Sequence, residues 1–451
     1  MARRLRLLLP LLAVWTLSRS ARAQNVGLRD KISQLFIFGS GEDPLFLAGS
    51  ADPSNPASIR AHGSHFVPSA VAENGSMIAF LLNAIGGNVS NAPIGSTSGG
   101  ETFHFEGGVP VRTSTSAGPI YAERGQTLGR GRSVVGISQT SSHFSSLRGV
   151  NLDNLELFFT HENVDFAGCD SAQGLGQPCK LMGIPLLEND VMQFLLNLDI
   201  NVHVTSIYAT YGLTDNLDVG VVLPVVSTSL HGSSLANIIP FGGPTAAHFF
   251  AGTPSNPVLS ASRDVSGSAV GLGDASVRVK LGVHQSPTTN VALQGEARFA
   301  TGNADELLGA GEFSARGLAI LSTRIGNFSA HGNTGFLYRA GGSVNSAVLG
   351  TVGFDQLLTD HVTIATDLVS EMQVGASKLH LPPPVNFDYP FKRTINPTSI
   401  PDMADNIVNG SFGFKFTPPG GFTIVTNALV PLNRGGLRAN VTYTAGLEYA
   451  F

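Results

Sequence analysis

The C-terminal stretch Leu437-Arg-Ala-Asn-Val-Thr-Tyr-Thr-Ala-Gly-Leu-Glu-Tyr-Ala-Phe451 decides the fold. Every odd position from Leu437 to Phe451 carries an apolar side chain, while the even positions carry Arg438, Glu448 and other polar or small residues. Because successive side chains of a β-strand point to opposite faces, this period of two predicts a strand with one apolar and one polar face. The chain therefore ends in a long amphipathic strand whose last residue is aromatic.

The same alternation recurs upstream, over residues 196–204, 277–283 and 291–299. Strands of about ten residues exceed the five or six typical of soluble sheets and match a tilted crossing of a bilayer. Beyond the N-terminal leader, no stretch approaches the roughly 18 apolar residues of a membrane helix. In lipid, the remaining structure that satisfies its own backbone hydrogen bonds is a closed barrel. We therefore predict an all-β fold, an antiparallel transmembrane β-barrel.

The number of strands follows from a count along the chain. About thirteen strands are expected between residues 131 and 451. A bacterial barrel with both termini in the periplasm needs an even number, so one more strand is expected from residues 100–124, around 101–106 or 119–123. This gives about 14 strands, with 12 as the alternative.

The connections can be assigned to alternating sides by counting back from Phe451. The long stretches 162–190, 229–266 and 375–404 then fall on one side, which we expect to be extracellular. The two Leu-Thr-Asp turns, at 213–215 and 358–360, fall together on the other side, where short turns belong.

Composition narrows the class of protein. Charged residues make up 13% of the chain, against about 25% in soluble domains, and the formal net charge is −5. Low charge alone would equally fit a secreted β-sandwich or a Gly-rich adhesin, so the periodicity decides for the barrel and for lipid as its partner. Nucleic acid is not expected as a partner, because binding it requires a basic surface.

The N-terminus has the features of an export signal. Three arginines precede the apolar run 7–17, and Ala21-Arg-Ala23 supplies the small residues of a cleavage site. Residues 1–23 are predicted to be a signal peptide, since a membrane anchor would need about 20 apolar residues. Residues 24–100 alternate poorly and are predicted to be a plug in the lumen or, alternatively, a periplasmic arm. The barrel domain is then residues 101–451.

Polar faces of the strands are expected to line the barrel interior and to pair across it, because charges in a narrow lumen are costly without partners. Their signs are mixed, which argues against an open pore dominated by one charge. The lumen-lining candidates are Asp199, His203, Arg278, Lys280, Glu296, Arg298, Asp367, Lys415 and Glu448.

Cys169 and Cys179 lie in one expected outer loop, and export favours a disulfide between them. A metal or redox role is the alternative, but their spacing lacks the close pairs that such sites use. No nucleophile elbow, phosphate-binding loop or zinc-peptidase motif occurs in the sequence. We therefore expect no enzyme activity, no cofactor and no metal.

Several turns carry a family resemblance. The stretch Tyr211-Gly-Leu-Thr-Asp-Asn-Leu-Asp-Val-Gly220 with Leu223-Pro224, the turn Gly271-Leu-Gly-Asp274 and the ending 446–451 resemble an outer-membrane transporter family tied to meta-cleavage degradation of phenol and related aromatics. The likeness covers about residues 131–451. It implies a bacterial outer-membrane location and a terminal Phe451 that is read by the barrel assembly machinery.

That family is similar to the long-chain fatty-acid channels, which are fourteen-stranded barrels with an N-terminal hatch. Tyr121-Ala-Glu-Arg124, followed by Gly129 and Gly131, resembles the opening of their first strands. The Asn-Pro-Ala-Gly stretch of their hatch is absent, so no gating residue is carried over. The expected function is passive uptake of small hydrophobic compounds, aromatics or fatty acids. The alternative is a structural or adhesive barrel without transport.

Overall fold

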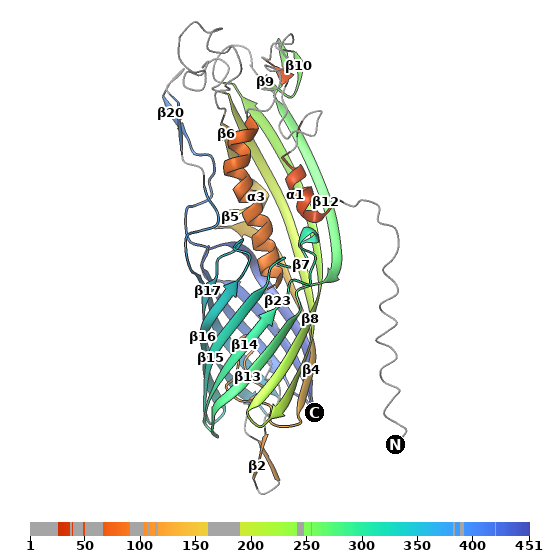
Figure 1. Ribbon diagram of the computed structural model, residues 1–451, viewed down its shortest axis with the longest axis vertical. Helices are drawn as coiled ribbons and strands as arrows, with labels where there is room; N and C mark the ends of the chain where they lie inside the picture. Colours follow the sequence, from red (N-terminus) through yellow and green to blue (C-terminus); the bar gives the residue numbers. More distant parts are fainter. Residues whose placement is uncertain are drawn as a thin grey trace, which may run out of the picture.

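A computed structural model describes most of the 451-residue chain (Figure 1). The described residues are 26–36, 38, 48–49, 66–90, 103–106, 109–112, 116–160, 190–240, 248–253, 255–381, 384–387, 392–419 and 421–451. The predicted signal peptide, residues 1–23, and the predicted disulfide between Cys169 and Cys179 lie outside this part of the chain.

Twelve strands close into an antiparallel ring. Strand β23 pairs with β4, and β7 pairs with both β4 and β8, so the ring has no free edge. The predicted antiparallel barrel is confirmed, with 12 strands in the ring. In chain order the ring consists of β4 (Ser133–Leu147), β7 (Val191–Thr214), β8 (Leu217–Ile239), β13 (Ser276–Gln285), β14 (Thr289–Arg298), β15 (Ser314–Ile325), β16 (Phe328–Arg339), β17 (Ala347–Thr359), β18 (Val362–Gln373), β21 (Ile407–Phe416), β22 (Phe422–Pro431) and β23 (Leu437–Ala450).

The strand expected from residues 100–124 is not part of the ring. Strands β2 (Phe103–Glu106) and β3 (Val109–Arg112) pair only with each other, as a hairpin. Pro110 cannot donate to a second ladder, and Gly118-Pro119 interrupts the stretch that follows. The ring therefore has the 12 strands of the alternative prediction, and with the strands paired outside the ring the sheet has 15.

Short turns gather at one end of the barrel, which we call the Phe451 rim. The backbone N of Phe451 donates to the carbonyl of Ser133 at 2.9 Å, and Ser133 pairs with Tyr211 beside the first Leu-Thr-Asp turn. Following the ladder around the ring puts the second turn, at 358–360, at the same rim, as predicted. The connections at the opposite end, the far rim, are longer.

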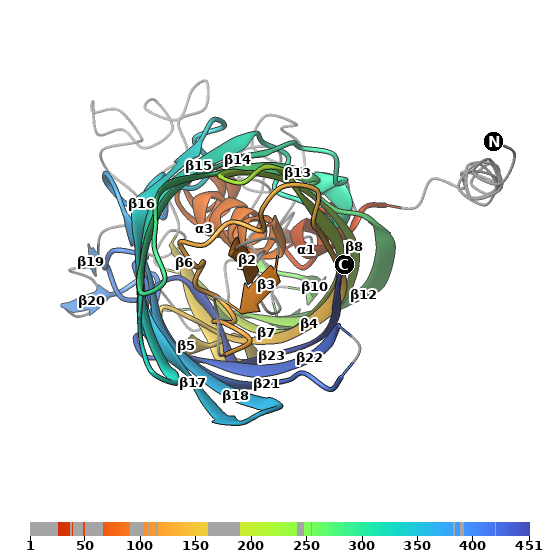
Figure 2. The same ribbon diagram turned by 90° about the horizontal axis from the view of Figure 1, so that it is seen from below.

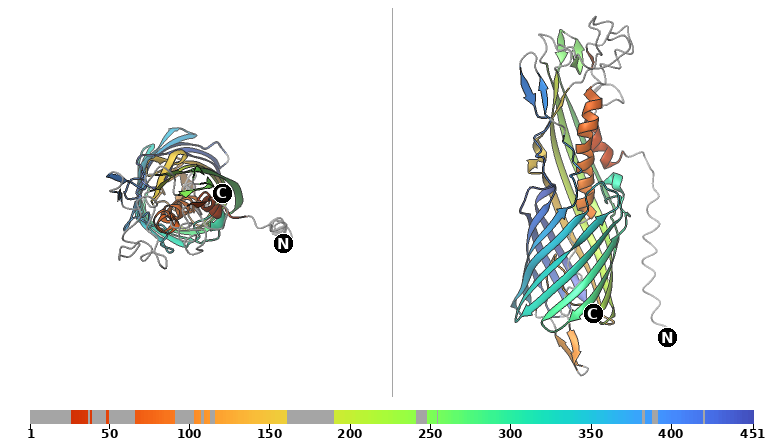
Figure 3. Two further views of the ribbon diagram at one scale, coloured as in Figure 1. Left: turned by 90° about the horizontal axis from the view of Figure 1, so that it is seen from above. Right: turned by 60° about the vertical axis from the view of Figure 1, so that its left-hand side comes forward.

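The stretch 229–266 was expected to be a loop, but much of it is strand. Strand β8 continues to Ile239, and β12 (Ser260–Leu272) pairs with this upper part of β8. Strand β6 (Leu155–Thr160) pairs in the same way with the upper part of β7. A four-stranded sheet, β6-β7-β8-β12, therefore rises beyond the far rim, and we call it the extension (Figures 1 and 3).

Two helices lie against the extension. Helix α1 (Leu28–Gln34) contacts β12, and the longer α3 (Phe66–Ser90) contacts β6 and reaches β23 (Figure 1). No helix in the described part of the chain is long and apolar enough to cross a membrane. The remaining short elements are β1 (Ala48–Gly49), β5 (Val150–Asn151), η2 (Leu152–Asn154), β9 (His248–Phe249), β10 (Ala251–Thr253), β11 (Asn256–Val258), η3 (Ala304–Glu306), β19 (Val385–Phe387) and β20 (Arg393–Ile395).

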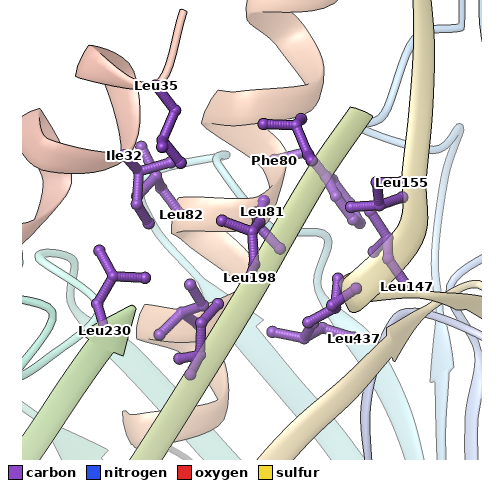
Figure 4. Packing of buried hydrophobic residues seen from close by; sticks show 14 of the residues in the cluster. Ile32, Leu35, Phe80, Leu81, Leu82, Leu147, Leu155, Leu198, Leu230 and Leu437 are labelled. Atoms are coloured by element: carbon purple, nitrogen blue, oxygen red, sulfur yellow. The ribbon is translucent and has the colours of Figure 1, made fainter. Parts of the chain in front are cut away.

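The apolar core of the molecule lies between these helices and the extension. Ile32 of α1, Leu35 directly after this helix, Leu81 of α3 and Leu198 of β7 are all at most 4% exposed and pack together (Figure 4). Phe194 of β7 joins them and meets three phenylalanine rings. Each such side chain contributes about 1.5–3 kcal/mol by leaving water, so this core fixes the helices to the sheet.

The outer surface of the ring is apolar. In the lower half of the barrel the outward side chains are exposed and hydrophobic, as in Val279 of β13 and Leu293 of β14, while their neighbours Lys280 and Gln294 are buried inside. An exposed hydrophobic belt around a closed ring is stable where it faces lipid rather than water. The barrel is therefore built to span a membrane.

Candidate functional site

Residues 116–128 form an irregular segment inside the ring, which we call the lumen segment. It hydrogen-bonds to strands on all sides of the barrel, among them β8, β13, β16, β18 and β23, which is only possible from within. Figure 2 shows the ring from the Phe451 rim. The lumen segment occupies the half of the barrel nearest this rim, because Thr127 bonds to the carbonyl of Asp215 in the first turn at 2.7 Å.

Glycines allow this segment to lie close to the wall. A Cβ on Gly125 would stand 2.4 Å from the carbonyl oxygen of Asn290, which is far too close. Gly118 has φ +91°, a conformation that favours glycine, and a Cβ there would meet the Arg124 side chain at 3.0 Å. The segment is therefore fitted to the lumen by its sequence.

An ion pair anchors the segment to β17. Arg124 Nη2 lies 2.9 Å from Asp355 Oδ2, and both side chains are at most 2% exposed. Ser116 Oγ donates to the same carboxylate, and Arg124 also donates to the Ser116 carbonyl at 3.0 Å. Breaking a buried pair of this kind typically costs about 3–5 kcal/mol, since the partner left behind is a buried unpaired charge.

A second anchor joins the segment to β13. Glu123 Oε2 lies 3.1 Å from Lys280 Nζ, and its other oxygen lies 3.8 Å from Arg278 Nη1. The backbone N of Glu123 also donates to Asn333 Oδ1 of β16 at 2.7 Å. Glu123 thus holds the segment to two strands that are not neighbours in the ring.

Further polar contacts complete the attachment. Asp367 of β18 accepts from the Tyr121 backbone N at 3.3 Å and from His331 Nε2 at 2.6 Å. Lys415 donates to the Ala117 carbonyl at 3.4 Å and lies 3.9 Å from Glu448. The segment and its partners therefore fill the lumen near the Phe451 rim with paired polar groups.

A cavity of about 250 Å³ lies between the lumen segment and the end of α3. Its floor includes Tyr121 and Glu123, and its roof includes Asn88 and Val89 of α3. Inward side chains from most of the ring form its walls. The cavity is thus bounded by the barrel on the sides and by N-terminal residues above and below.

The wall of the cavity has a charged part. Glu296 of β14 is surrounded by three guanidinium groups, those of Arg278 at 2.8 Å, Arg298 at 2.6 Å and Arg316 at 2.5 Å. Glu296 and Arg298 are at most 6% exposed. One carboxylate shared by three arginines leaves this side of the cavity with an excess of positive charge.

The rest of the wall mixes apolar side chains with polar ones such as Asn333, Thr351 and Asn409. The apolar lining residues come from β4, β7, β15, β16, β17, β18, β21, β22 and β23. They are Phe144, Val202, Val204, Leu318, Leu337, Leu349, Val369, Ile407, Leu429 and Leu437. The cavity therefore offers a molecule both an oily surface and a concentrated set of positive donors.

Seven of the nine predicted lumen residues are buried inside the barrel. Arg278, Glu296 and Arg298 line the cavity. The other four lie deeper, at or near the lumen segment, and are Lys280, Asp367, Lys415 and Glu448. Glu448 also accepts a hydrogen bond from the Tyr208 hydroxyl at 2.8 Å.

Asp199 and His203 were predicted to line the lumen, but this was wrong, because both lie on the outer surface. Asp199 is 52% exposed and sits 3.3 Å from His143, and His203 bonds to Ser141 Oγ at 2.9 Å on the same outer face of β4 and β7. Beyond the far rim, apolar helix residues cover the inner face of β7, so the polar side chains of β7 face outward there. The polar side chains of the strand therefore face inward only between the two rims.

Sequence reasoning missed several residues that hold the site. Asp355, His331 and Arg316 stand on inward positions of amphipathic strands, so their alternation was a usable signal. Glu123 and Arg124 had no such signal because the lumen segment has no periodicity. Their stretch, 121–124, resembled the opening of a first barrel strand, but the structure places it inside the ring instead.

Comparisons with known proteins extend these findings. A family model described as the MetA-pathway of phenol degradation matches residues 188–354, which run from the start of β7 into β17. No curated protein matches the chain by sequence. The matched range contains the turn motifs at 211–224 and 271–274, while the ending 446–451 lies beyond it.

Solved structures with similarity to the chain include membrane channels. An outer membrane channel from Pseudomonas putida F1 has 10% identity and a TM-score of 0.37, over 72% of this chain and 97% of that one. A FadL homologue from Pseudomonas aeruginosa has 9% identity and a TM-score of 0.29, over 71% and 89%. The toluene transporter TodX of P. putida has 7% identity and a TM-score of 0.29, also over 71% and 89%.

The strand ladder itself defines the fold. Over residues 188–354 the chain matches the phenol-degradation family that its turn motifs predicted.

Proposed function

We propose that this chain is an outer-membrane channel for passive uptake of small hydrophobic compounds. The observation that carries the proposal is the partly apolar cavity of about 250 Å³ within a closed ring whose outer belt is hydrophobic. Closed barrels of this kind belong to bacterial outer membranes, where lipid is the partner of the belt. Aromatic compounds are the preferred cargo because of the family match, and fatty acids are the second class.

The lumen segment is proposed to be the barrier that cargo must pass. The ring cannot widen without breaking its ladder, whereas the lumen segment is held by side chains, notably the Arg124–Asp355 and Glu123–Lys280 pairs. Passage from the cavity to the Phe451 rim then requires this segment to shift within a fixed barrel. The predicted plug, residues 24–100, is proposed to cover the outer mouth through α1 and α3.

Phe451 is proposed to be the signal that the barrel assembly machinery reads. Its side chain is 66% exposed at the end of β23 and stacks on Tyr449 with ring centroids 5.7 Å apart. It is therefore accessible for recognition at the Phe451 rim. The proposal fits its place at the end of the last strand, where the ring closes onto β4.

The barrier role can be tested by conductance in planar bilayers. Arg124→Ala removes a pair worth about 3–5 kcal/mol, so we expect an open state that is at least about tenfold more populated than in the wild type. Arg434→Ala is the matched control, since Arg434 is exposed near the far rim. A wild type and an Arg124→Ala variant that are equally silent would favour a structural or adhesive barrel without transport.

The cargo can be tested in a bacterium that carries the gene. We expect a deletion strain to grow more slowly on limiting aromatic carbon sources, and complementation with the wild type to restore the rate. Normal growth of the deletion strain on every aromatic and fatty-acid source tested would contradict uptake as the function.

A further inference from the structure

Arg438 of β23 is a buried arginine that forms no direct ion pair with a carboxylate among the described residues. It is 7% exposed, lines the cavity and has a single guanidinium nitrogen, Nη2, in hydrogen bonds. Nη2 donates to the Val408 carbonyl at 2.8 Å and to Asn433 Oδ1 at 2.7 Å. Nε is buried and has no partner within the described residues.

No described carboxylate forms an ion pair with this arginine. Glu371 also lines the cavity and its charge acts on Arg438 through space, but its ion pair is with Arg339, at 2.8 Å. Of the two other acids of the wall, Glu296 is already shared by three arginines and Glu123 pairs with Lys280 at 3.1 Å. A buried guanidinium without an anion is costly, so proteins retain one mainly where a ligand completes it.

The charges of the cavity wall sum to a positive value although the whole chain is acidic. Arg278, Arg298, Arg316 and Arg438 outnumber the three acids Glu123, Glu296 and Glu371, whereas the full sequence has a net charge of −5. The cavity wall thus carries one more positive than negative side chain. A site with excess positive charge attracts an anionic ligand and offers no partner to a cationic ligand.

Apolar side chains surround Arg438 on the cavity wall. Leu437 and Ala439 flank it in the chain, and Phe144 stands opposite Ala439 in the strand ladder. A bulge in the register between β23 and β4 brings Leu437 and Arg438, which are neighbours, both to buried positions. The arginine therefore presents its donors beside an oily surface.

We propose that the cavity binds the carboxylate of a small apolar acid, with Arg438 as the group that holds the anion. This assignment rests on the proposed channel function and narrows its cargo to carboxylates such as aromatic acids. Nη1 of Arg438 makes no hydrogen bond within the described residues, so it can donate a charge-assisted hydrogen bond to a carboxylate, and the apolar side chains of the wall take the ring or chain of the acid. A neutral hydrocarbon would leave the guanidinium without an anion, and inorganic phosphate would leave the apolar part of the wall unfilled.

Binding can be measured by calorimetry on the full-length chain in detergent at neutral pH. The probe is benzoate, and benzyl alcohol is its uncharged counterpart of similar size. We expect the wild type to bind benzoate at least about tenfold more tightly than benzyl alcohol, because a charge-assisted bond is lost with the alcohol. Arg438→Met should abolish this preference, and the exposed-site control Arg434→Met should keep it.

Arg438→Lys is a control for a folding defect, since lysine retains the positive charge but lacks the planar guanidinium. It should bind benzoate with an affinity between those of the wild type and Arg438→Met, and all variants should keep the strand content of the wild type by circular dichroism. A wild type without the preference, an Arg438→Met variant that keeps it, or phosphate that competes as well as benzoate does would each overturn the assignment.

Conductance separates this inference from the proposed function. A preference for benzoate in a protein whose Arg124→Ala variant never conducts would support the carboxylate site and refute the channel. Conductance without the preference would refute the site and leave the channel intact.

Discussion

Strands β7 and β8 run through both the ring and the extension, and the apolar side chains of β7 face opposite sides in these two regions. In the ring, β7 turns polar Ser206 and Thr210 inward and Ile207 outward, whereas in the extension it turns Leu198 inward and Asn197 outward. The backbone and its period of two are the same in both regions. What changes is the surroundings, which are lipid outside the ring and helices inside the extension.

The comparison teaches that alternation identifies a strand but not the direction of its faces. Apolar residues face whichever side excludes water, so the apolar face of β7 changes sides at about the far rim. Long amphipathic strands of this kind need an independent marker of where the membrane ends. Here the marker is the place where α1 and α3 begin to cover the sheet (Figure 3).

The largest effect should come from breaking the extension. Phe194→Ala removes a ring that is 0% exposed and that meets Phe36 at 5.7 Å and Phe159 at 4.5 Å. A truncation of this kind costs about 3–5 kcal/mol, and we expect the loss to appear as faster hydrogen exchange of α1 amides. Phe412→Ala is the control, because Phe412 faces outward on β21. Equal acceleration of α1 by both variants would contradict the separation of the two regions.

A smaller effect should come from a charge on the outer face of the ring. Ile207→Arg places a cation at an outward position that is 50% exposed in the isolated chain, at a cost of about 2–4 kcal/mol if it lies at the bilayer midplane. Asn197→Arg makes a similar change on the same face of β7, but in the extension, and should cost less than about 0.5 kcal/mol. Urea unfolding from lipid vesicles measures both, and similar costs would mean that the two positions share one environment.

Much of the fold was readable from the sequence. The alternation in β13, β14 and β23 predicted antiparallel barrel strands, and the count from Phe451 placed both Leu-Thr-Asp turns at one rim. The turn motifs of residues 211–224 and 271–274 also predicted the family that matches there. These features depend on residues that are close in the sequence, so they can be predicted without knowing which segments pack against each strand.

The rest depends on contacts between distant segments. Residues 116–128 lack periodicity, and only the closed ring shows that Arg124 faces Asp355 across 231 positions of sequence. Asp199 and His203 were misplaced for a related reason, because helices far earlier in the chain take the inner face of β7. That Arg438 lacks a direct ion pair likewise appears only when the ion pairs of the nearby acids are known.

The most direct test of the membrane boundary uses tryptophan fluorescence and lipids with brominated tails. The only tryptophan of the chain is Trp15, within the predicted signal peptide, so single probes can be introduced into the mature protein. Brominated lipid should quench Ile207→Trp strongly and leave Asn197→Trp close to its value in ordinary lipid. Equal quenching at the two positions, or none at either, would contradict the claim that β7 passes from lipid into water at the far rim.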